Sequence, residues 1–220
     1  MSTATKEKML NAAINLFYMQ GFDGTSVRHI AEKAKVNVAL VSYYFGGKKG
    51  LFEELMMTFF EGYLAILESE EKKVYSTKRD HLSGLLKELL IYQQQNHHLA
   101  RLVHREMTLD STLVRELMST YLRKEKHEIE SILRKGIQNG EFKKQPLDMV
   151  TLQIRHLIIM PYLYPHYLQE INQLSTTEPY FIKRYMEQIS LWIDKCLGKE
   201  QNIRTSKVYL PLATIKNKES

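Results

Sequence analysis

Cysteines and long apolar runs are scarce in this sequence, and each scarcity excludes a class of protein. Cys196 is the single cysteine among 220 residues, so neither an intrachain disulfide nor a zinc site with several cysteines can form. The most apolar segment, Leu157 to Tyr164, is less than half of the ~20 residues that a membrane-spanning helix needs. The first ten residues, MSTATKEKML, lack the apolar run of a signal peptide. We therefore expect a soluble protein of a reducing cytoplasm with no membrane partner.

The sequence also lacks the motifs that would indicate catalysis or a bound metal. The run Gly46-Gly47-Lys48-Lys49-Gly50 has neither the spacing nor the trailing Ser or Thr of a phosphate-binding loop. His97 and His98 are adjacent, so on a helix they point in different directions and make a poor pair of metal ligands. Cys196 falls on an apolar helical face, where we expect it to be inert. We expect no enzymatic activity, no cofactor and no metal.

Positive charge is concentrated at the start of the chain. The formal net charge is +6, and residues 1–50 hold seven Lys or Arg against three Asp or Glu. The other 170 residues are nearly balanced, with 24 basic against 22 acidic side chains. A local basic excess suits a polyanionic partner, so the front of the chain is where such a partner is expected to bind.

Apolar residues recur at three-and-four spacing along nearly the whole chain, which predicts an all-α protein of about nine helices. We find no convincing strand, repeat or low-complexity segment. Pro161 and Pro165 are expected to kink or end the eighth helix. The expected helices cover a first segment that ends at Gly21, then residues 27–34, 37–44, 48–70, 80–96, 98–108, 111–139, 147–168 and 179–197.

The second and third predicted helices are short and are joined by a tight turn. Lys35 and Val36 form this turn, and Asn37 caps the helix that follows. This is the helix-turn-helix arrangement, in which the second helix of the pair enters the DNA major groove. The first and fourth helices must pack behind the pair, because two short helices bury too little surface alone.

The stretch GFDGTSVRHIAEKAKVNVALVSYYFGGKKGLF resembles the DNA-binding signature of the TetR family of bacterial repressors. The resemblance covers residues 5–52, and the helical pattern after it fits the C-terminal dimerisation and ligand domain of that family. Two departures are Ser42, where many members carry tyrosine, and Gly46, where many carry proline. The positions that match are Gly21, Phe22, Thr25, Ile30, Ala31, Ala34, Val36, Val41, Tyr44, Phe45, Lys48, Leu51 and Phe52.

The resemblance implies three segments and a homodimer that binds double-stranded DNA. Residues 1–50 would be the helix-turn-helix domain, 51–198 the helical dimerisation and regulatory domain, and 199–220 a basic, flexible tail. A two-fold dimer places two reading helices about one DNA turn or more apart, so the site should be roughly palindromic. Such a protein would act at the nucleoid as a transcription regulator.

The expected DNA contacts come from the second and third helices and the start of the fourth. Val36, Val41 (or Leu40) and Phe45 should face the core, which leaves the opposite face of the third helix for the groove. Thr25 and Ser26 could instead be plain helix caps, and one of the two tyrosines could be a core residue. The candidates are Thr25, Ser26, Arg28, Asn37, Val38, Ala39, Ser42, Tyr43, Tyr44 and Lys48.

In the resembling family, the last two long helices of each subunit form a four-helix bundle with those of the partner. Here these helices would be about 147–168 and 179–197. The interface candidates on them are Leu152, His156, Ile159, Met160, Phe181, Tyr185, Ile189, Trp192 and Ile193.

Two functions for the long C-terminal part stay open. A small lipophilic effector could release the protein from DNA, in a pocket lined by aromatic residues that could equally be ordinary core residues: Tyr63, Tyr92, His104, Tyr121, Tyr162 and Tyr164. Alternatively, the stretch HLARLVHREMTLDSTLVRELM presents charges for a protein partner, or simply a solvated face. This stretch is similar to a TetR-type group that binds DNA flanking the replication origin and acts on the division protein FtsZ in cell division. Its charged candidates are Arg101, Arg105, Glu106, Arg115 and Glu116.

Overall fold

The computed structural model describes residues 3–108 and 112–199, and it confirms the all-α class, with no strand among these residues. Within this part of the chain, no helix combines the length and the hydropathy needed to cross a membrane. The predicted tail lies outside the described residues except for Lys199. The helices are α1 (Thr3–Gln20), α2 (Val27–Ala34), α3 (Val38–Phe45), α4 (Lys48–Glu71), α5 (Lys78–Gln95), α6 (His97–Glu106), α7 (Thr112–Gln138), α8 (Leu147–Leu163), α9 (Pro165–Asn172) and α10 (Pro179–Trp192), followed by a π-helical turn (Ile193–Leu197).

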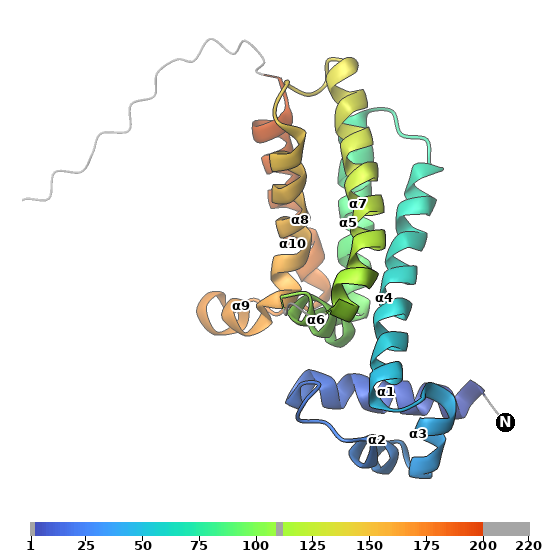
Figure 1. The fold of residues 1–220 in the computed structure, drawn as a ribbon. Coiled ribbons are helices and arrows are strands. Elements are labelled where there is room, and N and C mark those ends of the chain that lie inside the picture. Colours follow the sequence, from blue (N-terminus) through green and yellow to red (C-terminus); the bar gives the residue numbers. More distant parts are fainter. Residues whose placement is uncertain (1–2, 109–111, 200–220) are drawn as a thin grey trace, which may run out of the picture.

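The helices form a small unit and a longer bundle (Figure 1). Helices α1, α2 and α3, here called the head, lie together at one end. Helix α4 leads out of the head and runs along the bundle formed by α5, α7, α8 and α10, here called the body. Helix α6 lies across the end of the body that faces the head and packs on α1. The head is therefore joined to the body through α4 and through the α1–α6 contact.

Aromatic rings hold the head together. The rings of Phe17, Phe22 and Phe52 contact one another, with centroid separations of 5.6 Å, 5.9 Å and 5.0 Å. They join α1, the loop after it and the start of α4, so the helix that leaves the head is part of its core. Rings of this size bury enough apolar area to stabilise a unit as small as this one. The other buried residues of this core include Met9, Ala13, Ile30, Ala31, Val41, Phe45 and Leu51.

The predicted eighth helix is two helices, which corrects the expected count. Tyr164 adopts φ −118° and ψ 49°, which ends α8, and Pro165 opens α9 at a first-turn position where a proline loses no hydrogen bond. Pro161 does not end α8 but lies inside it. A proline has no N–H, so the Leu157 carbonyl four residues earlier loses its helical partner. The Tyr185 hydroxyl of α10 donates to that carbonyl at 2.9 Å.

We expect Tyr185→Phe to destabilise the protein, because it leaves the Leu157 carbonyl without a donor. The cost of an unsatisfied buried carbonyl is about 1–3 kcal/mol. Urea unfolding at fixed protein concentration measures it. Tyr180→Phe, at a half-exposed position on the same helix, is the matched control and should change the free energy of unfolding little. Equal effects of the two variants would contradict this role of Tyr185.

Candidate nucleic-acid interface

A tight, fully hydrogen-bonded turn joins α2 to α3. Lys35 takes the left-handed conformation (φ 56°) after α2, and its N–H and that of Val36 both donate to the Ala31 carbonyl. Asn37 caps α3, because its Oδ1 accepts from the Ala39 N–H at 2.9 Å. These bonds satisfy backbone groups that helix ends leave free. The turn therefore fixes the orientation of α3 against α2, as the sequence predicted from Asn37.

Helix α3 has one buried face and one exposed face. Val41 and Phe45 are buried, which confirms the predicted core face, and Leu40 is partly buried. The exposed face carries Asn37, Val38, Ala39, Ser42 and Tyr43. A helix with an exposed face of short polar and apolar side chains fits a major groove about 12 Å wide.

The two neighbouring tyrosines differ in environment. Tyr43 is 76% exposed, whereas Tyr44 is partly buried and packs against the head core. Their rings meet edge to face at 5.3 Å, and Tyr44 also leans on Phe45 at 6.2 Å. Tyr44 therefore braces Tyr43, whose hydroxyl extends into solvent where a phosphate could accept from it.

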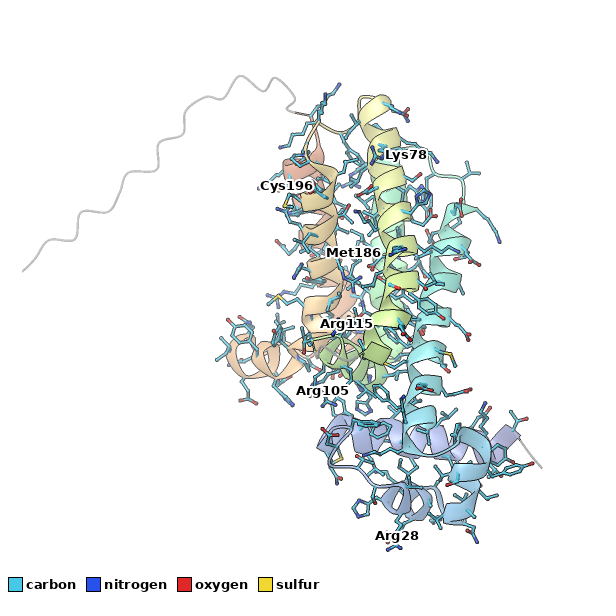
Figure 2. All side chains as sticks on the ribbon, in the orientation of Figure 1. Arg28, Lys78, Arg105, Arg115, Met186 and Cys196 are labelled. Carbon is cyan, nitrogen blue, oxygen red and sulfur yellow. The ribbon has the colours of Figure 1, made fainter. Side chains whose placement is uncertain are left out.

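The three candidates around the start of α2 also differ in exposure, because Thr25 is buried whereas Ser26 and Arg28 are exposed. Thr25 is only 2% exposed, and its hydroxyl donates to the Gly21 carbonyl at 2.8 Å, so it caps the end of α1 and is not presented to a phosphate. Ser26 is exposed and caps α2 by accepting from the His29 N–H at 3.1 Å. Arg28 is exposed on α2, on the side of the head away from the body (Figure 2).

Lys48 has a structural contact that the sequence did not reveal. Its ammonium donates to the Phe22 carbonyl at 2.9 Å and lies 4.3 Å from the centroid of the Phe22 ring. It therefore ties the first turn of α4 to the loop between α1 and α2, and two N–H bonds remain for a phosphate. Gly46 just before it has φ 69°, which a proline cannot adopt, so the departure from the family pattern here reflects a different turn.

The dimer candidates fall into an exposed set and a buried set. Phe181, Ile189 and Ile193 are at most 3% exposed within the chain's own core, which corrects their assignment to an interface. The Tyr185 hydroxyl donates to the Leu157 carbonyl of the same chain. Ile159 and Trp192 are partly buried. Exposed residues with helical spacing remain on α8, and we call them the α8 stripe: Met149, Leu152, His156 and Met160.

The charged candidates of the central stretch do not form one exposed surface. Arg105 donates to the Phe17 carbonyl of α1 at 3.2 Å and pairs with Glu106, which is buried. Arg101 lies 4.9 Å from the centroid of the Tyr18 ring. These side chains therefore connect the body to the head. Of the five candidates, only Arg115 and Glu116 are exposed, and both belong to α7. Figure 2 labels Arg115 there.

The aromatic residues expected to line an effector pocket are packed closely. Tyr63, His104 and Tyr121 border a hollow of only about 10 Å³, and Tyr121 stacks on Phe60 at 4.8 Å. Tyr92 donates to the Phe59 carbonyl beside them. Burial lowers the pKa of His104 to about 3, so this imidazole is neutral. An effector could enter here only if side chains moved.

The remaining two pocket candidates lie elsewhere, and a larger hollow lies on the body. Tyr162 is buried and donates to the Leu90 carbonyl, and Tyr164 is exposed. A groove of about 890 Å³ runs between α5 and α10. Its lining includes the apolar residues Ile91, Ile182 and Met186 and charges of both signs: Lys87, Lys183, Glu187 and Asp194.

Comparisons with known proteins agree with this geometry. The model of "Bacterial regulatory proteins, tetR family" matches residues 9–55. The "Probable HTH-type transcriptional regulator YttP" of Bacillus subtilis is 45% identical over 194 residues, which is 88% of this chain and 94% of that protein. The negative transcriptional regulator IcaR of the Staphylococcus aureus biofilm operon icaADBC is 34% identical over 73 residues, 32% of this chain and 39% of IcaR.

A solved structure extends the likeness to the whole fold. The transcriptional regulator FadR of Bacillus subtilis, in complex with stearoyl-CoA, superposes with a TM-score of 0.64 at 17% identity. The match covers 84% of this chain and 97% of FadR. At this identity the likeness concerns the fold. The sequence relatives are transcriptional regulators.

Proposed function

Because this chain belongs to the tetR family of bacterial regulatory proteins, we propose that it binds a specific, roughly palindromic DNA site as a homodimer and represses transcription there. Residues 1–50 would read the DNA at the nucleoid, and residues 51–198 would hold the dimer together and regulate it. The observation that carries the proposal is the exposed face of α3, from Asn37 to Tyr43. It stands on a core formed by Val41 and Phe45 and is flanked by the exposed cations Arg28 and Lys49.

Footprinting of the purified full-length protein across its own genome tests this proposal. We expect protected sites with two related half-sites, and an affinity that falls steeply with salt because phosphate contacts release counterions. Protection without any shared sequence would overturn specific binding. Protected sites remote from promoters would contradict the proposed repression of transcription.

We expect Leu152→Glu or Met160→Glu to weaken the dimer, because each puts a carboxylate on the α8 stripe. Exposed apolar patches of this kind mark interfaces, and two-fold symmetry brings the same patch of both copies together. A cost of about 1.5 kcal/mol per copy raises the dissociation constant of the dimer roughly 100-fold. Sedimentation over a dilution series measures it. Met57→Glu, at an exposed position of α4, is the control. Equal dissociation of the control and stripe variants would contradict the α8 stripe as the interface.

A release of DNA by a lipophilic effector is the second candidate function. The groove between α5 and α10 favours it, because its lining combines apolar side chains with Lys87, Lys183, Glu187 and Asp194, which suits an amphiphile with a polar end. FadR, which shares the fold, was solved with stearoyl-CoA. A lipophilic acid that lowers DNA affinity in the wild type but not in Met186→Asp would support this candidate.

A role like that of the group that binds origin-flanking DNA and acts on FtsZ stays a prediction, because neither the described residues nor the relatives test it. Arg101, Arg105 and Glu106 are engaged between head and body, so they present no common surface to FtsZ. Arg115 and Glu116 are the exposed candidates for such a surface.

A further inference from the structure

A third hollow lies at the joint between head and body, separate from the small hollow beside Tyr63 and from the groove; Tyr162 is among its lining residues. It measures about 200 Å³, which suits a small polar group. Its walls come from α1, α6, the α8–α9 junction and the loop that precedes α10. The residues used below are Tyr18, His97, Arg101, His166, Ser175 and Thr177.

Arg101 brings a positive charge to this pocket without a carboxylate to balance it. Among the described residues, no Asp or Glu lines the pocket, and none lies within ion-pair distance of Arg101. Its guanidinium is held by neutral groups. It lies over the Tyr18 ring, and Nη1 donates to Nε2 of His166 at 3.0 Å. A partly buried arginine without a counter-charge favours an oxyanion, which its planar fork can bind with two hydrogen bonds.

Two neighbouring histidines lie at the start of α6 beside Arg101, and His97 lines the pocket. His97 places Nδ1 3.2 Å from the Gln94 carbonyl, so Nδ1 carries the hydrogen and Nε2 is the second nitrogen of the ring. His98 contacts His97 at a ring separation of 4.2 Å. Burial, His97 and Arg101 together lower the pKa of His98. The surroundings therefore disfavour further positive charge until an anion is present.

Neutral donors complete the pocket. The hydroxyls of Ser175 and Thr177 are 2.9 Å apart. Gln94 fixes the loop that carries them, because Nε2 donates to the carbonyls of Thr176 and Glu178 at 2.7 Å and 3.1 Å. The pocket also lies at the first residue of α6, His97, where first-turn N–H groups and the helix dipole favour negative charge.

The same side chains do not suit a metal ion. Among the described residues, no three His, Cys, Asp or Glu side chains converge in a way that could hold one. Arg101 would also repel a cation, because its guanidinium stays protonated and positively charged. The donor set therefore selects for negative charge.

We propose that this pocket binds the oxyanion end of a small metabolite, a phosphate or carboxylate group, through Arg101, which His166 orients, and through the Ser175–Thr177 hydroxyls. The Arg101–His166 bond requires an unprotonated Nε2 on His166. His166 would orient the guanidinium, and the anion would accept from Arg101 and from the Ser175 and Thr177 hydroxyls. Arg101 would turn from the Tyr18 ring of the head towards the ligand, so occupancy changes the contact between α1 and α6.

Thermal unfolding of the full-length protein in inorganic phosphate, in acetate and in chloride at equal ionic strength tests the site. If phosphate binds at about 1 mM, 10 mM phosphate raises the folding equilibrium constant roughly tenfold. We expect Arg101→Gln and Thr177→Val to lose this stabilisation. Arg134→Gln, at an exposed arginine paired with Glu130 on α7, should keep it. Stabilisation by acetate but not phosphate would identify a carboxylate as the ligand group.

Two results would overturn the proposal. One is that neither phosphate nor acetate stabilises the protein more than chloride does. The other is that Arg101→Gln and Thr177→Val respond as strongly as Arg134→Gln, because the anion would then bind elsewhere on the surface.

The expected effect of the anion on DNA affinity rests on the proposed function. We expect 10 mM of the stabilising anion to lower DNA affinity at least threefold beyond equal chloride, and Arg101→Gln to remove this difference. An anion that stabilises the protein without changing DNA affinity would overturn the coupling. A protein that responds to the anion but binds no DNA sequence would overturn the proposed function and leave the site standing.

Discussion

Ala39→Glu should abolish specific DNA binding while leaving the head folded. Ala39 is exposed in the first turn of α3, and its N–H is already capped by Asn37. A carboxylate in a first helical turn interacts favourably with the helix dipole, so α3 should lose no stability. In the major groove the same carboxylate would face phosphates and base acceptors. A penalty of about 2 kcal/mol per head becomes about 4 kcal/mol in a dimer, roughly a thousandfold in affinity.

Val74→Glu is the matched control for this charge change. Val74 is 99% exposed in the loop between α4 and α5, at the end of the body away from the head. Val74→Glu lowers the net charge by the same amount as Ala39→Glu. Any loss of DNA affinity from weaker long-range attraction therefore appears in both variants. Fluorescence anisotropy with the footprinted duplex measures both affinities. If Ala39→Glu binds as Val74→Glu does, α3 is not the reading helix.

The head was predictable from sequence because its signals are local. The caps Ser26 and Asn37 lie next to the helices that they start, and Val41 and Phe45 follow one helical period. Thr25 shows the limit of such patterns. A hydroxyl at a helix start suits a cap of the next helix, a phosphate contact or a bond back to the previous helix. The structure shows the bond back to the previous helix, because the Gly21 carbonyl lies within hydrogen-bond distance of the Thr25 hydroxyl.

The contacts between head and body could not be predicted, because they join residues far apart in sequence. Arg105 donates to the Phe17 carbonyl across a separation of 88 residues, and within its own stretch it looks like any exposed helical arginine. The buried dimer candidates failed for a related reason. Phe181 and Ile189 share an apolar face of α10, but periodicity does not tell whether such a face packs on the same chain or on a second copy.

A buried ionic network in the body is the basis of a second prediction, which concerns the free energy of unfolding. Glu125 of α7 accepts from the Tyr63 hydroxyl of α4 at 2.9 Å and from the Arg155 guanidinium of α8. The Glu125 side chain is 3% exposed and that of Arg155 is 21% exposed. Burial and the neighbouring Glu125 raise the pKa of Tyr63 well above its ordinary value, so this hydroxyl stays protonated and donates. One carboxylate thus joins three helices.

Glu125→Leu should destabilise the protein by about 3–5 kcal/mol, because it leaves the partly buried Arg155 charge unpaired. Arg155→Leu should cost a similar amount, since the buried carboxylate then has only Tyr63 as a donor. The double variant removes both charges and should cost less than either single change. Urea unfolding of the four forms at one protein concentration gives the coupling energy.

Glu125→Gln refines the cycle, because it removes the charge and keeps an acceptor for Tyr63. We expect the free energy of unfolding of Glu125→Gln to lie between those of the wild type and Glu125→Leu. Additive costs in the double variant would mean that Glu125 and Arg155 act separately. The network joins α4, which enters the head, to α8, which carries the α8 stripe. If the pair couples as expected, DNA affinity should fall in both single variants more than in the double variant, since an unpaired charge loosens the helix that supports the head.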